Sequence, residues 1–567
     1  MLRKNGQSQT MANRMDHLHA GAVAAIAAYV LSALFAAWLL TQGIVSASKL
    51  RPETLSTLQW LVAQDRFVAP VMAVLTMLVL LLAQRGVGVG SIPSGRLWVW
   101  ALAVFAFVET ILISRFAFAG YALTLDEFMP EFQATIFRAG HVLAPLGDYL
   151  TDADRLQPFF TYVDAEHGLW GSNYRPGHAA LLAIVPRAFG VSLLNPVLLL
   201  ISVLALAGVS RRLFPDRPEM PVLAALMLLA WPQVMVTAGS GFAFSAHLAL
   251  NLVWLNLFLR RNFWMHVLAA LVGAYAIGLH QVHVHPLFAF PFLVGLLFGV
   301  FGRWVWVLPY AVVYFPALIV WISWAEIAVW LETGDWSVFP SNITALHYLA
   351  DYLQYSEDAG AREAGFERLF LSANLLRFFS WASPVIPILG LAALFRIRHI
   401  GSVPIAALAS ILLTGVASHV LMANQMQGWG TRYLHPVIGC SILVALAGYD
   451  GLLRSENAAV TRRLVGGLIL TSILVLVPWR AMQVAEKVLP RAEVQAALTQ
   501  VDADVVVLAP MPVWYLPDFV RNDPFLENRP LLVLGSGDGL PGRKATLGHE
   551  DLRQMGLPYG TYYEPGN

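Results

Sequence analysis

Two neighbouring carboxylates are the first residues in this sequence whose position suggests chemistry. Asp126 and Glu127 lie in the stretch LDEFMPEFQATIFRAG (125–140), just after an apolar segment and at the start of a helical pattern. Carboxylates at such a position stabilise the first turn of a helix by capping it and by interacting with its dipole. They can also act as a general acid or base. The spacing leaves both roles open, and the two roles are compatible.

A second polar motif, GLWGSNYRPGHAALLA (168–183), contains Arg175 and His178 on either side of a turn. Pro176 and Gly177 predict that turn directly before an apolar helix. Arg175 would then lie where the chain returns to the membrane, at the depth of a lipid phosphate. A guanidinium can bind phosphate with two parallel hydrogen bonds. Snorkelling of the side chain towards water is the alternative.

A third motif, GLHQVHVHPLFAFP (278–291), contains three histidines between two apolar segments. His280, His283 and His285 are close enough in sequence to share a metal ion or an anion. A helix places the first two on one face, whereas an extended chain places the last two on one face. A metal site would therefore need ligands from other loops, and a polar turn at the membrane surface is the simpler interpretation.

A fourth motif, QMQGWGTRYLHP (425–436), combines glycines with Arg432, Tyr433 and His435. Aromatic residues gather at membrane surfaces, which accounts for Trp429 and Tyr433. That preference does not account for an arginine beside them, so we interpret Arg432 as a second contact for an anion.

The elements that position these motifs are expected to be transmembrane helices. Hydrophobic residues make up 58% of the chain and charged residues 13%, a balance that suits lipid rather than water. The net charge of +1 gives no basic surface for nucleic acid, so no nucleic-acid partner is expected. The single Cys440 excludes an internal disulfide framework and a thiolate metal cluster. The first apolar run is too long for a cleaved signal peptide and is expected to remain as a spanning helix.

Apolar windows of roughly 17 to 25 residues predict about thirteen spans and therefore an all-α polytopic membrane protein surrounded by membrane lipids. These windows lie near 20–42, 66–84, 99–118, 192–210, 220–238, 243–259, 264–281, 286–302, 304–325, 378–395, 402–423, 435–451 and 464–484. The segment 178–190 is too short to span the membrane, and we expect it to be re-entrant or interfacial.

Basic residues predict the orientation of the spans. Those at alternate span ends gather on one side, which the positive-inside rule makes cytoplasmic: Arg3, Lys4, Arg14, Arg211, Arg212, Arg260, Arg261, Arg303, Arg396, Arg398, Arg462 and Arg463. The N-terminus is then cytoplasmic, and the loops 119–177, 326–377 and 424–434 and the C-terminal tail lie on the opposite side. All four polar motifs fall on that side at a membrane boundary, where ionisable residues are candidates for function.

The chain divides into three expected regions. Residues 1–98 hold the N-terminal segment and two additional spans, residues 99–484 form the transmembrane core with the acidic loop 119–177, and residues 485–567 form an external tail. In the tail, DVVVLAP (504–510) and PLLVLG (530–535) predict short buried strands, and 491–500 and 549–555 predict helices. A small α/β appendage is therefore expected.

The motifs, taken in order, resemble one family. LDEFMPEFQATIFRAGHVLAP, WGSNYRPGHAALLA, SGFAFSAHLALNLVWLNLFLR, HQVHVHPLFAFP and GWGTRYLHP are similar to motifs of bacterial membrane glycosyltransferases. These enzymes are related to dolichyl-phosphate-mannose–protein mannosyltransferase and to the lipid A aminoarabinose transferase, and they share the GT-C fold. The resemblance covers roughly residues 99–484.

The resemblance implies a set of roles. Asp126 would be the catalytic base, with Glu127 beside it. The donor would be a sugar on a polyprenyl phosphate, and the residues implied in holding its phosphate are Arg175, Arg432, Tyr174 and Tyr433. The residues implied in contacting substrate or a metal are His283, His285 and His178. The aminoarabinose transferases have a Lys-Pro-Pro element where this chain has Arg175-Pro176-Gly177, so the cation is retained and the second proline is absent.

The family allows a divalent metal ion in some members and no cofactor in others. The acceptor would be a lipid, a glycan or a protein hydroxyl on the external face, and the location would be a bacterial inner membrane with a periplasmic C-terminus. A transporter or flippase of a lipid-linked glycan is the alternative from another class. Such proteins favour charged residues at mid-membrane, whereas the expected spans here contain almost no carboxylates except Glu109. This favours the enzyme.

Overall fold

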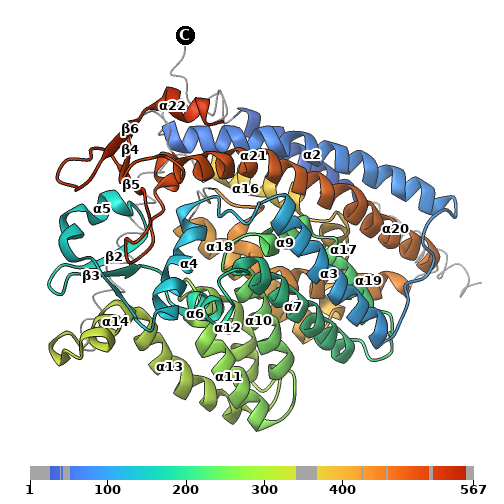
Figure 1. The fold of residues 1–567 in the computed structure, drawn as a ribbon. Coiled ribbons are helices and arrows are strands. Elements are labelled where there is room, and N and C mark those ends of the chain that lie inside the picture. Colours follow the sequence, from blue (N-terminus) through green and yellow to red (C-terminus); the bar gives the residue numbers. More distant parts are fainter. Residues whose placement is uncertain are drawn as a thin grey trace, which may run out of the picture.

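The computed structural model describes residues 26–38, 40–42, 52–339, 367–422, 425, 427–454, 457–509 and 515–556, and these are mostly helical (Figure 1). An apolar helix, Ile26–Gln42, precedes the labelled helices. In chain order these are α2 (Pro52–Gln84), α3 (Arg96–Phe116), α4 (Leu125–Arg138), α5 (Ala153–Leu156), α6 (Gly177–Ile184), α7 (Val191–Leu213), α8 (Met220–Leu229), α9 (Pro232–Gly239), α10 (Phe244–Phe258), α11 (Phe263–Ile277), α12 (Val284–Leu297), α13 (Leu308–Ile322), α14 (Trp324–Thr333), α16 (Glu367–Trp381), α17 (Val385–Leu394), α18 (Ser402–Leu421), α19 (Ile438–Leu453), α20 (Ala458–Thr471), α21 (Val477–Leu498) and α22 (His549–Gln554).

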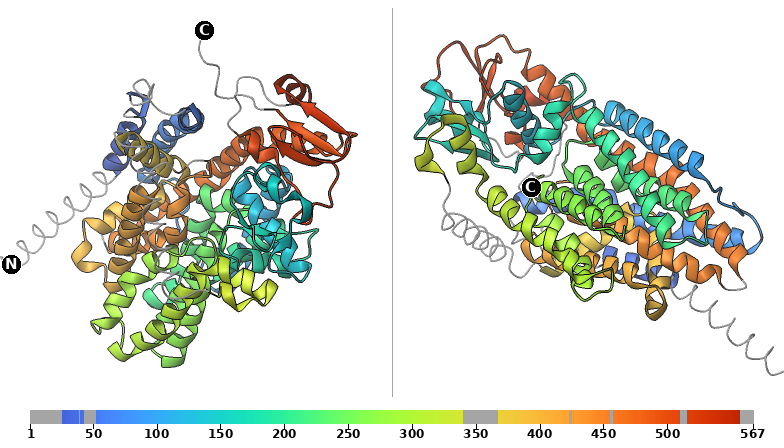
Figure 2. Two further views of the ribbon diagram at one scale, coloured as in Figure 1. Left: turned by 90° about the vertical axis from the view of Figure 1, so that its left-hand side faces the viewer. Right: turned by 90° about the horizontal axis from the view of Figure 1, so that it is seen from below.

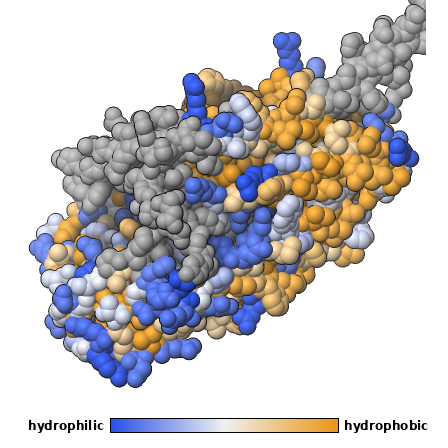
Figure 3. Space-filling model, turned by 90° about the horizontal axis from the view of Figure 1, so that it is seen from above, coloured by the Kyte–Doolittle hydropathy of each residue, from blue (hydrophilic) through white to orange (hydrophobic). Residues whose placement is uncertain are grey.

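Seven helical segments of the described residues are long and apolar enough to cross a membrane. They are Leu58–Gln84, Arg96–Phe116, Val191–Leu213, Trp304–Ile322, Ser402–Leu421, Arg432–Leu453 and Ala458–Leu498. Helices suit a bilayer because they satisfy their own backbone hydrogen bonds. The chain is therefore a multi-pass membrane protein. Figure 3 shows the apolar surface over the helical part and polar residues gathered at the end that carries the loops and the tail.

The expected count of thirteen spans is not established. Within the part of the chain that the structure describes, counting each bent helix pair as one span gives up to nine, and four further apolar helices are shorter. The windows at 220–238 and 378–395, each expected to be a span, coincide with the two bent pairs. α8 and α9 meet at 64°, and residues 368–381 meet α17 at 111°. Pro232 and Pro384 follow the two breaks, and proline both lacks an amide donor and disfavours a helical residue before it. Trp231 is accordingly extended.

The longest helical segment, Ala458–Leu498, contains a π-helical turn, η6 (Ser472–Leu476), between α20 and α21. At 41 residues it exceeds the roughly 20 residues that cross the hydrocarbon core. The boundary expected at residue 485 therefore falls within α21. Figure 1 shows this helix lying along α2, and Gln64 and Gln483 join the two by hydrogen bonds.

The acidic loop 119–177 has its own structure. α4 packs on a three-stranded antiparallel sheet in the order β1-β3-β2, built from β1 (Ala144–Pro145), β2 (Thr161–Asp164) and β3 (Leu169–Ser172). Val163 pairs with Trp170 in the register of β2 and β3. This sheet places the turn at 173–176 beside the start of α4.

The tail contains a second sheet, in which β4 (Val505–Leu508) lies parallel to both β5 (Leu531–Leu534) and β6 (Lys544–Leu547). β4 and β5 lie where the sequence predicts strands. The tail packs against the acidic loop in both views of Figure 2. One apolar cluster includes Phe132, Trp170, Val505 and Val533, and thus contains side chains of both regions. The tail and the acidic loop are therefore packed as one unit.

Candidate functional site

The site begins at the first turn of α4. Thr124 is the N-cap, and its Oγ1 accepts a hydrogen bond from the Glu127 amide at 3.4 Å. The Glu127 carboxylate accepts one from the Leu123 amide at 2.9 Å. The capping role that the sequence allowed for Asp126 is therefore filled by Thr124. The side chain of Asp126 makes its contacts elsewhere.

The carboxylate of Asp126 is contacted by one residue from each of the other three motifs. Tyr174 donates its hydroxyl to Oδ1 at 2.7 Å, and Arg432 donates Nη1 to Oδ2 at 2.8 Å. His280 Nε2 lies 3.4 Å from Oδ1, and the rings of Tyr174 and His280 are 4.2 Å apart. The fold thus brings together one residue from each of the four polar motifs.

The two adjacent carboxylates have opposite pKa shifts. Burial alone would raise the pKa of Asp126, but the contacts with His280, Arg432 and Tyr174 bring it well below its usual range. Burial raises the pKa of Glu127 to about 8, and the charge of Asp126 adds to this shift. At neutral pH Asp126 is therefore ionised while Glu127 carries a proton. Such a division is a common feature of acid–base sites.

Arg432 is tied to protein groups on two sides. Besides Asp126, it donates Nη2 to the hydroxyl of Tyr433 at 3.0 Å, and its guanidinium lies 4.9 Å from the centre of that ring. The sequence led us to expect Arg432 and Tyr433 at a donor phosphate. The structure places Arg432 on the candidate base, and Tyr433 beside Arg432.

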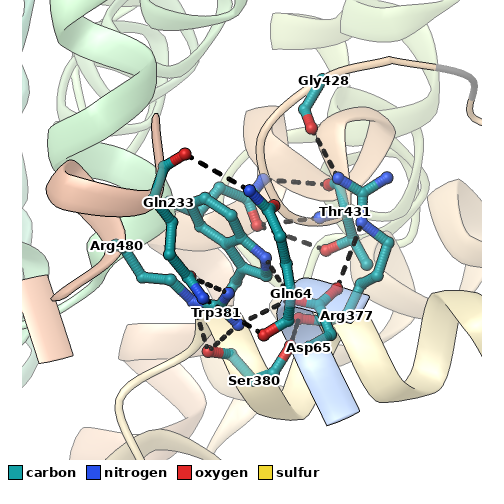
Figure 4. Close-up of polar contacts among 10 residues, drawn as sticks. Gln64, Asp65, Gln233, Arg377, Ser380, Trp381, Gly428, Thr431 and Arg480 are labelled. Atoms are coloured by element: carbon teal, nitrogen blue, oxygen red, sulfur yellow. Dashed lines mark hydrogen bonds and ion pairs between the residues drawn. The ribbon is translucent and has the colours of Figure 1, made fainter. Parts of the chain in front are cut away.

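The loop that carries Arg432 is held by residues that the sequence analysis did not single out (Figure 4). Gln233 donates to the Thr431 carbonyl at 3.0 Å and accepts from the Thr431 amide at 3.1 Å. Arg377 donates Nη2 to the Gly428 carbonyl at 2.5 Å. Both side chains are buried, so they fix the backbone on the N-terminal side of Arg432.

Arg377 belongs in turn to a buried charge cluster centred on Asp65 of α2 (Figure 4). Asp65 lies 2.7 Å from Arg480 and 3.8 Å from Arg377, and it accepts the indole N–H of Trp381 at 2.9 Å. An arginine within an apolar segment, as Arg480 is, was the available signal for this cluster. Through this cluster α2, which the sequence analysis placed outside the transmembrane core, is linked to the loop that carries Arg432.

Arg175 and His178 line a pocket next to Tyr174 and His280. The pocket is small, with room of about 10 Å³, roughly the space of one water molecule. Arg175 donates Nη1 to the Asn173 carbonyl at 3.3 Å. Burial lowers the pKa of His178 to about 3, so this imidazole is neutral. The pocket therefore combines the guanidinium of Arg175 with a neutral imidazole at His178, and it lies beside Asp126.

The three histidines of 278–291 do not meet at one point. His280 contacts Asp126, whereas His285 lies within the helices and contacts Asn251 at 2.8 Å and Tyr314 at 2.7 Å. His283 occupies the N-cap position of α12. Among the residues that the structure describes, no three His, Cys, Asp or Glu side chains are grouped as metal ligands. No ligand set is therefore assigned to a divalent ion.

No protein-family model and no curated protein matches the chain. Among solved structures, it is similar to ArnT from Cupriavidus metallidurans bound to undecaprenyl phosphate, with 13% identity and a TM-score of 0.45 over 78% of this chain and 86% of that one. The same protein in the apo state gives 14% identity and a TM-score of 0.38 over 74% and 84%. ArnT is a lipid A aminoarabinose transferase, one of the groups that the sequence motifs resemble.

Proposed function

We propose that this chain is a membrane glycosyltransferase that moves a sugar from a polyprenyl phosphate to an acceptor hydroxyl, with Asp126 as the general base. The observation that carries the proposal is the setting of Asp126. One ionised carboxylate, held by a guanidinium, a phenol and an imidazole, lies beside a pocket that a further cation, Arg175, helps to line. A base and anion-binding groups at one place are what such a transfer requires.

The step is a single displacement at the anomeric carbon. The acceptor O–H bond breaks as its oxygen forms a bond to that carbon, and the proton passes to Asp126. The bond between the anomeric carbon and the phosphate oxygen breaks, and the lipid phosphate leaves with the electron pair. Attack and departure occur on opposite faces of the sugar, so the configuration inverts. The chemistry needs no nucleotide-binding domain.

The low pKa of Asp126 makes it a weak base while Arg432 is bound to it. We therefore expect donor binding to change the pKa of Asp126. A donor phosphate near Arg432 competes with Asp126 for the same guanidinium. Loss of part of that ion pair lets burial raise the pKa of Asp126, because the positive charge that stabilised the carboxylate is shared with the phosphate. In this account Arg432 serves both the base and the leaving phosphate, and donor binding strengthens the base.

The remaining assignments follow from the same arrangement. Arg175, which lines the pocket, supplies a second contact for the donor phosphate, and Tyr174 orients Asp126 through its hydroxyl. The acceptor is a lipid, a glycan or a protein hydroxyl. The site faces the periplasm of a bacterial inner membrane, with the N-terminus in the cytoplasm.

Purified full-length protein in nanodiscs tests the proposal. We would supply a panel of polyprenyl-phosphate sugars with a cell-envelope lipid and glycan fraction, and follow both products by mass spectrometry. Release of polyprenyl phosphate together with a glycosylated acceptor is the expected result. Movement of an intact lipid-linked sugar across vesicles, with no cleavage in any assay, would instead support a flippase.

A further inference from the structure

The C-terminal tail reaches the helix that carries Asp126. The 3-10 helix η7 (Leu516–Phe519) lies against the start of α4, and Asp518 accepts a hydrogen bond from the Leu125 amide at 2.8 Å. Leu125 is the first residue of α4 and directly precedes Asp126. The contact joins residues 393 positions apart in the sequence.

Arg521 strengthens the same contact from the next turn of the tail. Its Nε donates to the Asp518 carbonyl at 2.7 Å. Its guanidinium lies 4.1 Å from the centre of the Tyr121 ring and 5.6 Å from that of Phe128. Tyr121 precedes α4 and Phe128 ends its first turn, so Arg521 contacts both ends of the segment that Asp518 holds.

The tail is itself firmly placed on the acidic loop. Asn522 donates to the Leu156 carbonyl at 2.7 Å, and Trp170 donates its indole N–H to the Pro524 carbonyl at 2.8 Å. Together with the shared apolar cluster, these bonds fix η7 relative to α4. The packing of the tail against the acidic loop thus holds the carboxylate of Asp518 at the Leu125 amide.

The division of hydrogen bonds at this turn shows what Asp518 contributes. The Glu127 amide is satisfied by Thr124 and the Leu123 amide by Glu127, both within the same stretch of chain. The Leu125 amide takes its partner from the tail. The first amides of a helix have no partner within the helix. An acceptor that reaches one of them from outside therefore stabilises the first turn and fixes its position.

We infer that Asp518 is a positioning residue for Asp126, through which the C-terminal tail sets the orientation of the candidate base. The inference rests on the proposed function, since it assigns to Asp518 an effect on sugar transfer. Asp518 acts on Asp126 through the Leu125 backbone. The contact itself requires an acceptor oxygen at this distance, so the test separates that oxygen from the negative charge.

The test compares variants that separate the acceptor from the charge. Asp518→Ala removes the acceptor and should lower kcat about 10- to 100-fold, because misplacement of a catalytic group by about 1 Å costs that much. KM for the donor should stay within about two-fold, since Asp518 is absent from the pocket lining. Asp518→Asn keeps an acceptor oxygen at the same length and should restore kcat to near the parent value.

Asp502→Ala is the matched control, because this carboxylate is on the same tail, is 92% exposed and pairs with Arg543. It should leave kcat unchanged. Should Asp518→Ala fail to fold, Asp518→Glu replaces it: this variant keeps the charge but displaces the oxygen by one methylene, so it should be slower than Asp518→Asn. An unchanged kcat in Asp518→Ala, or a faster Glu than Asn variant, would overturn the inference.

Hydrogen exchange separates this inference from the proposed function. Amides in a peptide covering residues 121–128 should exchange about ten-fold faster in Asp518→Ala, and at the parent rate in Asp518→Asn and Asp502→Ala, because the exchange rate follows local opening. If the parent protein transferred no sugar but the exchange pattern held, the proposed function would fail while the anchoring of α4 stood. Equal exchange in all variants would contradict the anchoring itself.

Discussion

Arg432 Nη1 and Asp126 Oδ2 lie 2.8 Å apart and join two motifs separated by 306 residues. The pair connects the candidate base to the loop that Gln233 and Arg377 hold in place. It means that a residue expected at the donor phosphate also controls the protonation of the base. Substitutions at Arg432 should therefore change the pH profile as well as donor affinity.

For Arg432→Ala we expect the acid limb of the kcat profile to shift to higher pH. Burial raises the pKa of Asp126, and removing the guanidinium removes one of the contacts that oppose this effect. Arg432→Lys keeps a point charge and should shift the limb less, although it loses the planar fork that reaches both Asp126 and Tyr433. Rate profiles between pH 4 and 9 on folded protein provide the check. An acid limb that stays in place in the Ala variant would argue against control of Asp126 by Arg432.

Arg175 should affect the donor and leave the base alone. Arg175→Ala is expected to weaken binding of a polyprenyl-phosphate sugar by about 10- to 100-fold, the range for loss of one charge-assisted hydrogen bond, and Lys should recover part of it. Titration of the lipid into protein in nanodiscs measures this. Equal affinity in the parent and Ala proteins would assign Arg175 to interfacial snorkelling.

Glu127 should make the protein less stable as the pH rises. Its pKa is about 8 in the folded protein against an ordinary value of 4.5, so between these values the folded state holds a proton that the unfolded state has lost. Stability therefore falls as pH increases through this window. The Tm should drop between pH 5 and pH 9, and the drop should be smaller in Glu127→Gln. Parallel Tm curves for the two proteins would show that Glu127 does not carry this effect.

Local features of the site were predictable from the sequence, whereas the pairing between them was not. The start of α4 follows from Thr124 and the carboxylates after it, because a cap is a contact between near neighbours. The strands of the tail follow from short apolar runs. The contact of Asp126 with Arg432 depends on the folding of the whole chain, and spacing suggested only that both lie on one side of the membrane.

The dependence of contacts on the folding of the whole chain also explains where the structure differs from the sequence-based expectations. His280 and His285 are five residues apart, yet only His280 contacts Asp126, because α12 begins between them and carries His285 into the helical bundle. Apolar windows likewise identified the helices but not the bends before Pro232 and Pro384, since hydropathy contains no information on backbone angle. The contact between Asp518 and the Leu125 amide could not be predicted from the residues around either position, because it joins segments far apart in the sequence.

The most direct test of the account is sugar transfer by Asp126→Asn, beside the parent protein and Glu127→Gln. Asn keeps the size of the side chain and can still accept the Tyr174 hydroxyl, but it cannot take a proton from the acceptor. We predict that kcat falls about 100- to 10,000-fold, the usual contribution of a general base, while donor binding and folding are retained. Parent-like transfer by folded Asp126→Asn would contradict the assignment of the base.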